Sequence, residues 1–103
     1  MSMIRDIQRM QTRVPKAGRV LRRIREERGL TVRDVNLRSR AIAKRLRNPD
    51  YALALSALWE IEAEGKVPHL YRLASLAKIY GRSFDELLGL YKVGAARRRK
   101  RRA

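Results

Sequence analysis

The sequence predicts a compact all-α domain built from five helices. Apolar residues recur three and four positions apart through the central part of the chain, a spacing that places them on one face of a helix. No segment alternates apolar and polar residues as a half-buried strand does. With 103 residues, 45% of them hydrophobic, the chain can fill one small core. We therefore expect one domain, over residues 17–91.

The first helix is expected over residues 17–28. Its inward face is predicted by Val20, Leu21 and Ile24, while arginines occupy the outer positions. Gly29 ends the helix, because glycine adopts the left-handed cap conformation at little cost.

The second helix begins after Thr31, whose hydroxyl can accept a backbone N–H, with Asp34 placed to complete a capping box. It is predicted to run as far as Arg47, because the residues 48–50, Asn-Pro-Asp, favour a turn. Three apolar residues mark its inward face: Val35, Ile42 and Leu46.

The third and fourth helices are expected over residues 54–63 and 69–80, separated by a break from Gly65 to Pro68. Leu58 and Ile61 face inward on the third helix. On the fourth helix the predicted core residues are Leu70, Leu73, Ala77 and Tyr80. Both helices are apolar enough to contribute to one core.

The fifth helix opens with Ser83 and Glu86, which have the spacing of a full capping box. Its apolar residues follow helical spacing: Phe84, Leu87, Leu88 and Tyr91. Gly81 ends the preceding helix, so the connection between the two helices is short.

Both termini are basic. Residues 1–16 form either a short amphipathic helix or a frayed arm. Residues 92–103 are expected to be a flexible, disordered tail, because like charges repel and have no apolar neighbours to bury. We expect phosphate contacts from six residues of this tail: Arg97, Arg98, Arg99, Lys100, Arg101 and Arg102.

The charge of the chain points to a polyanionic partner. Its formal net charge is +16, and residues 17–50 alone carry 11 basic and 4 acidic side chains. The chain has no cysteine and one histidine, so we expect no metal site and no cofactor. No nucleophile stands beside a base, and no small-molecule site is evident, which argues against an enzyme. The lack of a long apolar run argues against membrane insertion and favours a cytoplasmic, nucleoid-associated protein.

Four short motifs occur in a familiar order: residues 25–31 (REERGLT), residues 58–62 (LWEIE), Pro68, and residues 73–81 (LASLAKIYG), closed by residues 83–88 (SFDELL). Through them the chain resembles the repressor-like helix-turn-helix family, the regulators of the Cro and phage-repressor type. The resemblance covers residues 17–91.

The resemblance implies that the third helix enters the major groove of DNA and that the second helix crosses the backbone. It also implies that Glu62 has a structural role, for which an arginine of the first helices is a suitable partner. A homodimer is a further expectation, with candidate surfaces at the fifth helix around Tyr91 and at the N-terminal segment.

The chain departs from the family between the second and third helices. Asn36 stands where the family often has alanine, and about a dozen extra residues follow, so we expect a lengthened second helix or inter-helix loop. This region places basic side chains near the DNA backbone. The expected phosphate contacts are Arg33, Arg38, Arg40, Lys44, Arg45, Arg47 and Lys66.

The third helix offers a poor set of base-reading side chains, since base edges are normally contacted by Arg, Lys, Asn or Gln. The expected groove-facing residues are Leu55, Ser56, Ala57 and Trp59. For Trp59 a DNA contact competes with a protein contact or partial burial.

We therefore expect a non-enzymatic transcriptional regulator that binds double-stranded DNA. The alternative is an adaptor or antitoxin-like partner that docks a protein on its apolar third helix. RNA or general nucleoid binding is a third reading, although the few aromatic residues argue against stacking on single strands.

Overall fold

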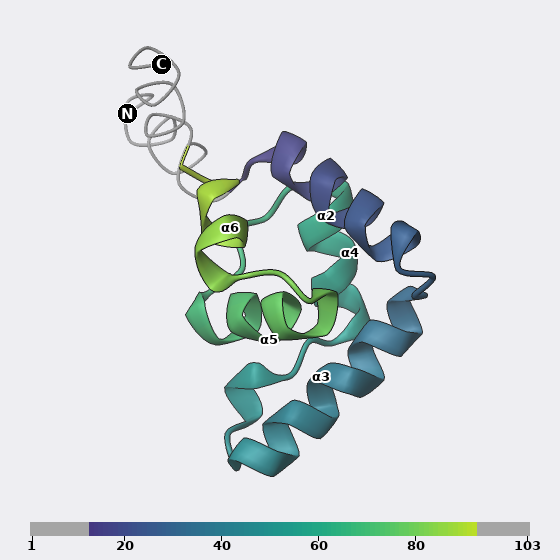
Figure 1. The fold of residues 1–103 in the computed structure, drawn as a ribbon, viewed down its shortest axis with the longest axis vertical. Coiled ribbons are helices and arrows are strands. Elements are labelled where there is room, and N and C mark those ends of the chain that lie inside the picture. Colours follow the sequence, from purple (N-terminus) through teal and green to yellow (C-terminus); the bar gives the residue numbers. More distant parts are fainter. Residues whose placement is uncertain (1–12, 93–103) are drawn as a thin grey trace.

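Five α-helices and one short 3₁₀-helix make up residues 13–92, the part of the chain that the computed structural model describes. Their bounds are α2 Pro15–Glu27, α3 Val32–Leu46, η1 Pro49–Tyr51, α4 Leu55–Ala63, α5 Leu70–Tyr80 and α6 Phe84–Gly89. This described part contains no strand, so the predicted all-α class is confirmed for it. Figure 1 shows α5 across the middle of the molecule, α2 and α4 on one side of it, and α3 extending below.

Most of the predicted arm (1–16) and tail (92–103) lies outside the described residues, whereas Pro15 and Lys16, expected in the arm, belong to α2. Residues 1–12 and 93–103, which include all six of the predicted tail contacts, belong to neither a described helix nor a described loop. Among residues 13–92, no helix has the length and apolar character needed to cross a bilayer.

Local chemistry explains where the helices begin and end. Pro15 is the first residue of α2, where its missing N–H costs no hydrogen bond. The capping box before α3 is complete: Asp34 N donates to Thr31 Oγ1 over 3.0 Å, and Thr31 N donates to Asp34 Oδ2 over 2.9 Å. Before α6 only half of the predicted box forms, with Glu86 N donating to Ser83 Oγ over 3.0 Å.

The core is built from side chains of all five helices and of the connection before α4. Its most deeply buried large side chains are Leu21, Val35, Leu53, Leu58, Leu73, Leu76, Tyr80 and Leu87. Helix α2 approaches α4 so closely that a side chain at Gly18 would lie 2.6 Å from the carbonyl oxygens of Ile61 and Glu62. Only glycine permits this crossing, which brings the two backbones together.

Two predicted core residues are exposed instead. Leu46 is 50% exposed because it lies in the last turn of α3, which extends beyond the bundle. Leu70 is 62% exposed as the first residue of α5, and Leu76 and Ile79 fill the core further along the same helix. Val20, Phe84, Leu88 and Tyr91 pack at the edge of the core and are only partly buried.

The connection between α3 and α4 combines the two expected forms of lengthening. Helix α3 continues for 15 residues, and η1 follows before α4 begins. The returning chain is fastened by side chains: Leu53 N donates to Ser39 Oγ over 2.8 Å, and Asn36 Nδ2 donates to the Leu53 carbonyl over 2.6 Å. Ser75 Oγ donates to the carbonyl of Tyr51 over 2.6 Å. These hydrogen bonds attach the segment between α3 and α4 to two helices, α3 and α5.

Candidate nucleic-acid interface

Helix α4 exposes one narrow, mostly apolar stripe to solvent. Ser56, Trp59 and Ala63 recur at three and four positions, all are exposed, and we call them the α4 stripe. Trp59 is 59% exposed and is the most exposed large apolar side chain of α4. Leu55 borders the stripe and is 43% exposed.

Ala57 does not belong to this surface, contrary to expectation. It is only 9% exposed, because it shares the inward side of α4 with Leu58 and Ile61. The helix begins one residue later than predicted, at Leu55, and its first two side chains, Leu55 and Ser56, are exposed. Of the four expected groove-facing residues, three remain available.

A buried ion pair fixes α4 against α2. Arg25 Nε donates to Glu62 Oε2 over 2.7 Å and Nη2 donates to Oε1 over 3.0 Å, while the two side chains are only 11% and 9% exposed. The remaining Nη1 donates to the Leu30 carbonyl over 2.8 Å. The hydrogen bond to Glu62 raises the pKa of Arg25 above its ordinary value, although burial opposes this. Glu62 therefore has the arginine partner from the first helices that the sequence predicted, and the pair joins α4 to α2.

The basic residues of α3 divide between two sides of the helix. Arg33, Arg40 and Lys44 follow one another at seven and four positions, so they share one face, which we call the α4-side flank. Asn36 lies on this face, three residues after Arg33, and its amide reaches the carbonyl of Leu53 just before α4. The α4-side flank therefore adjoins the start of α4.

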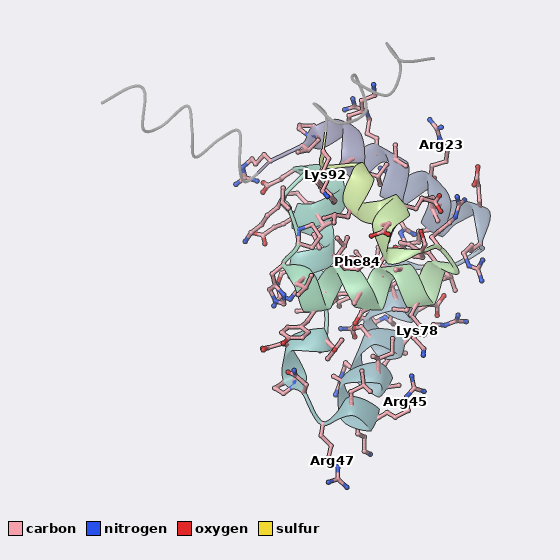
Figure 2. All side chains as sticks on the ribbon, turned by 60° about the vertical axis from the view of Figure 1, so that its left-hand side comes forward. Arg23, Arg45, Arg47, Lys78, Phe84 and Lys92 are labelled. Atoms are coloured by element: carbon pink, nitrogen blue, oxygen red, sulfur yellow. The ribbon has the colours of Figure 1, made fainter. Side chains whose placement is uncertain are left out.

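Arg38 and Arg45 are seven residues apart and lie on the other side of α3, which we call the outer flank. Figure 2 shows Arg45 and Lys78 of α5 extending toward the same edge of the molecule, with Arg47 at the tip of α3. An acidic residue accompanies this flank: the N–H and hydroxyl of Thr31 hold the pKa of Asp34 below its usual value, and the charge of Arg38 adds to the effect. The structure therefore does not gather all the predicted phosphate contacts on one surface.

None of the five predicted cations of α3, nor Arg47 directly after it, forms an ion pair with any residue of the described range 13–92. All six side chains are exposed. Elsewhere in this range cations do find carboxylates, as in the pair between Arg22 and Glu26 at 3.2 Å and the pair between Arg82 and Glu86 at 2.7 Å. Unpaired guanidinium groups on one helix provide a surface suited to phosphates.

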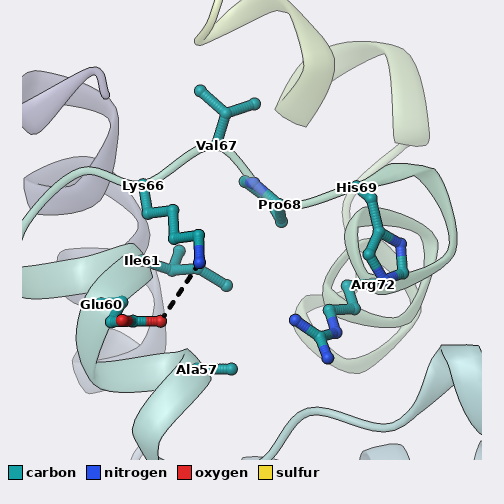
Figure 3. Close-up of a pocket in the computed structure, with 8 residues that line it drawn as sticks. All are labelled: Ala57, Glu60, Ile61, Lys66, Val67, Pro68, His69 and Arg72. Atoms are coloured by element: carbon teal, nitrogen blue, oxygen red, sulfur yellow. Dashed lines mark hydrogen bonds and ion pairs between the residues drawn. The ribbon is translucent and has the colours of Figure 1, made fainter. Parts of the chain in front are cut away.

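Lys66, the last predicted contact, lies at a cavity of about 250 Å³ that is lined in part by α4. Its Nζ is 3.5 Å from Glu60 Oε1, so its charge is partly engaged. Figure 3 shows Glu60 and Lys66 on one wall of the cavity and His69 and Arg72 on the other. The sequence assigned His69 only to a helix start and gave no sign of Arg72; in the structure both line the same cavity as Lys66.

Comparisons of the chain with protein families, with curated proteins and with solved structures found no match.

Proposed function

We propose that this chain binds double-stranded DNA as a transcriptional regulator, with α3 and α4 acting as a helix-turn-helix pair. In this arrangement the α4 stripe enters the major groove, which is about 12 Å wide and admits a helix. The α4-side flank of α3 then lies over the neighbouring phosphates. The observation that carries the proposal is the set of exposed, unpaired cations on the face of α3 that adjoins the start of α4.

The chemistry of the α4 stripe implies that affinity exceeds selectivity. Leu55 and Trp59 offer apolar contact to thymine methyl groups, and Ser56 offers one hydroxyl for a hydrogen bond. No side chain of the stripe makes the bidentate contact that provides about 1 to 3 kcal/mol of discrimination per base pair. Phosphate neutralisation therefore supplies most of the binding free energy, and binding falls steeply with salt.

Replacing Arg33, Arg40 and Lys44 by glutamine should reduce the salt dependence of duplex binding. The plot of log affinity against log salt has a negative slope, and each phosphate contact contributes about −0.9 to it. Losing three contacts therefore makes the slope less steep by about 2.7. The measurement is fluorescence anisotropy of the full chain with a labelled random-sequence duplex at several salt concentrations.

The matched control replaces Arg38, Arg45 and Lys78 by glutamine. This variant also loses three positive charges, but from positions outside the α4-side flank. Its slope should change by less than half as much. Equal losses in the two variants would show that net charge alone governs binding, and would contradict the placement of α4 against DNA.

Trp59 is the only tryptophan of the chain, so its emission reports directly on the α4 stripe. Duplex binding should shield this exposed indole from iodide quenching at constant ionic strength. Duplex binding without any protection of Trp59 would show that the cations hold DNA while α4 faces elsewhere.

Duplex binding that leaves Trp59 unprotected would favour the second candidate function, protein docking on α4. It is supported by the exposure of Trp59 on the α4 stripe, which carries no cation, and of Leu55 at its border. An adaptor or antitoxin-like protein would use this stripe for an apolar partner and would bind DNA weakly.

A further inference from the structure

The cavity beside α4 is lined by both apolar and polar side chains. Ala57, Ile61, Val67 and Pro68 supply the apolar part, and four polar side chains surround it: Glu60, Lys66, His69 and Arg72. Its volume of about 250 Å³ is well above the about 15 Å³ that a single water needs. The cavity therefore has room for a polyatomic group.

Arg72, which lines this cavity, carries an unsatisfied donor. Its Nε is buried and has no hydrogen-bond partner among the described residues. Its guanidinium forms no ion pair with a described residue either. A buried donor without a partner costs about 1 to 3 kcal/mol, and more when it is charged, so it calls for an acceptor. Figure 3 shows the guanidinium pointing from α5 toward α4, across the cavity.

The charges around the cavity leave an anion as the matching acceptor. Glu60 is the one carboxylate among the residues that line it, and Lys66 lies 3.5 Å from its Oε1. This pair balances itself, which leaves the guanidinium of Arg72 as the uncompensated charge. His69 and the remaining protons of Lys66 provide further donors at the rim. Several donors around one space suit a group with several acceptor oxygens, such as phosphate.

The cavity also has the right place relative to α4. Ala57 and Glu60, which line it, lie on the side of α4 next to the α4 stripe. A helix in the major groove has one phosphate backbone on each side of it. With the α4-side flank of α3 near the start of the stripe, the cavity offers a separate contact further along the helix.

We propose that this cavity binds a phosphate group through Arg72, Lys66 and His69, and that the group comes from the DNA backbone beside α4. The choice of DNA as the source of the phosphate rests on the proposed function. The phosphate site itself is independent of that function, because a free phosphate ion presents the same oxygens.

The test uses the full chain and two probes, inorganic phosphate and a random-sequence duplex. In an NMR titration with phosphate, the Nε–H resonance of Arg72 should shift and saturate, while sodium chloride at equal ionic strength leaves it in place. Arg72→Met should weaken duplex binding roughly tenfold, the effect of about one charge-assisted contact, and lower the salt slope by about 0.9. Lys78→Met is the matched control on α5, away from the cavity, and should change binding less than twofold.

Each result decides between the alternatives. A shift with phosphate together with normal duplex binding by Arg72→Met would mean a site for free phosphate and would overturn the DNA source. The absence of a shift with both probes would overturn the site itself. Equal losses in Arg72→Met and Lys78→Met would reduce the effect to net charge and would also overturn it. If the chain bound no duplex at all, the proposed function would fail and the phosphate titration would still decide the site. Arg72→Lys keeps the charge and serves if Arg72→Met does not fold.

Discussion

Glu62→Ala is expected to lower the free energy of unfolding by about 3 to 5 kcal/mol. The change leaves the guanidinium of Arg25 buried without its carboxylate, with only the carbonyl of Leu30 as a partner. Removing one member of a buried pair is costly because the remaining charge keeps its desolvation penalty and loses its compensation. Urea unfolding followed by far-ultraviolet circular dichroism measures the change.

Glu64→Ala is the matched control, since it removes a carboxylate two residues away. Glu64 pairs with Arg13 at 3.0 Å, but the two side chains are 39% and 48% exposed. A pair so accessible to water contributes about 0 to 1 kcal/mol. Changing Arg25 and Glu62 together to methionine should recover most of the loss, because two apolar side chains leave no unpaired charge. If Glu62→Ala cost no more than Glu64→Ala, the pair would not fix α4.

The helix boundaries were largely predictable because they depend on neighbouring residues. Thr31 and Asp34 cap α3 through hydrogen bonds that span three residues, and Gly29 follows α2 with a φ of 69°. Such short-range chemistry is visible in a sequence. The ends of α2, α3, α4 and α5 lie within two residues of their expected positions.

Burial was less predictable, because periodicity identifies a face of a helix but not whether another element covers it. Leu46 continues the inward face of α3 from Ile42, yet no element covers it at the end of the helix. Leu53 shows the opposite case. It lies in a connection without periodicity and is 0% exposed, because Ser39 and Asn36 bind its backbone and hold it against the bundle.

The candidate interface was predictable in composition but not in arrangement. The seven-residue spacing that separates Arg33 and Arg40 from Arg38 and Arg45 is present in the sequence, so the division of α3 into two flanks had a visible signal. Which flank adjoins α4 depends on the contact of Asn36 with residue 53, a tertiary feature. The unpaired guanidinium of Arg72 is likewise a result of packing alone.

Leu53→Ala is expected to lower the free energy of unfolding by about 2 to 5 kcal/mol, as large-to-small changes in a packed core do. The leucine is fully buried, so the change removes apolar contacts and leaves a cavity where α3 meets the start of α4. Leu55→Ala deletes the same atoms two residues later, at a side chain that is 43% exposed, and should change stability by about 0.5 kcal/mol or less.

Urea unfolding of both variants, with duplex affinity measured on the folded protein, separates the two roles. Leu55→Ala should weaken DNA binding without loss of stability, since this side chain borders the α4 stripe. Equal destabilisation by the two changes would show that the side chain of Leu53 contributes no more to the core than that of Leu55, and would contradict the burial of this segment against the bundle.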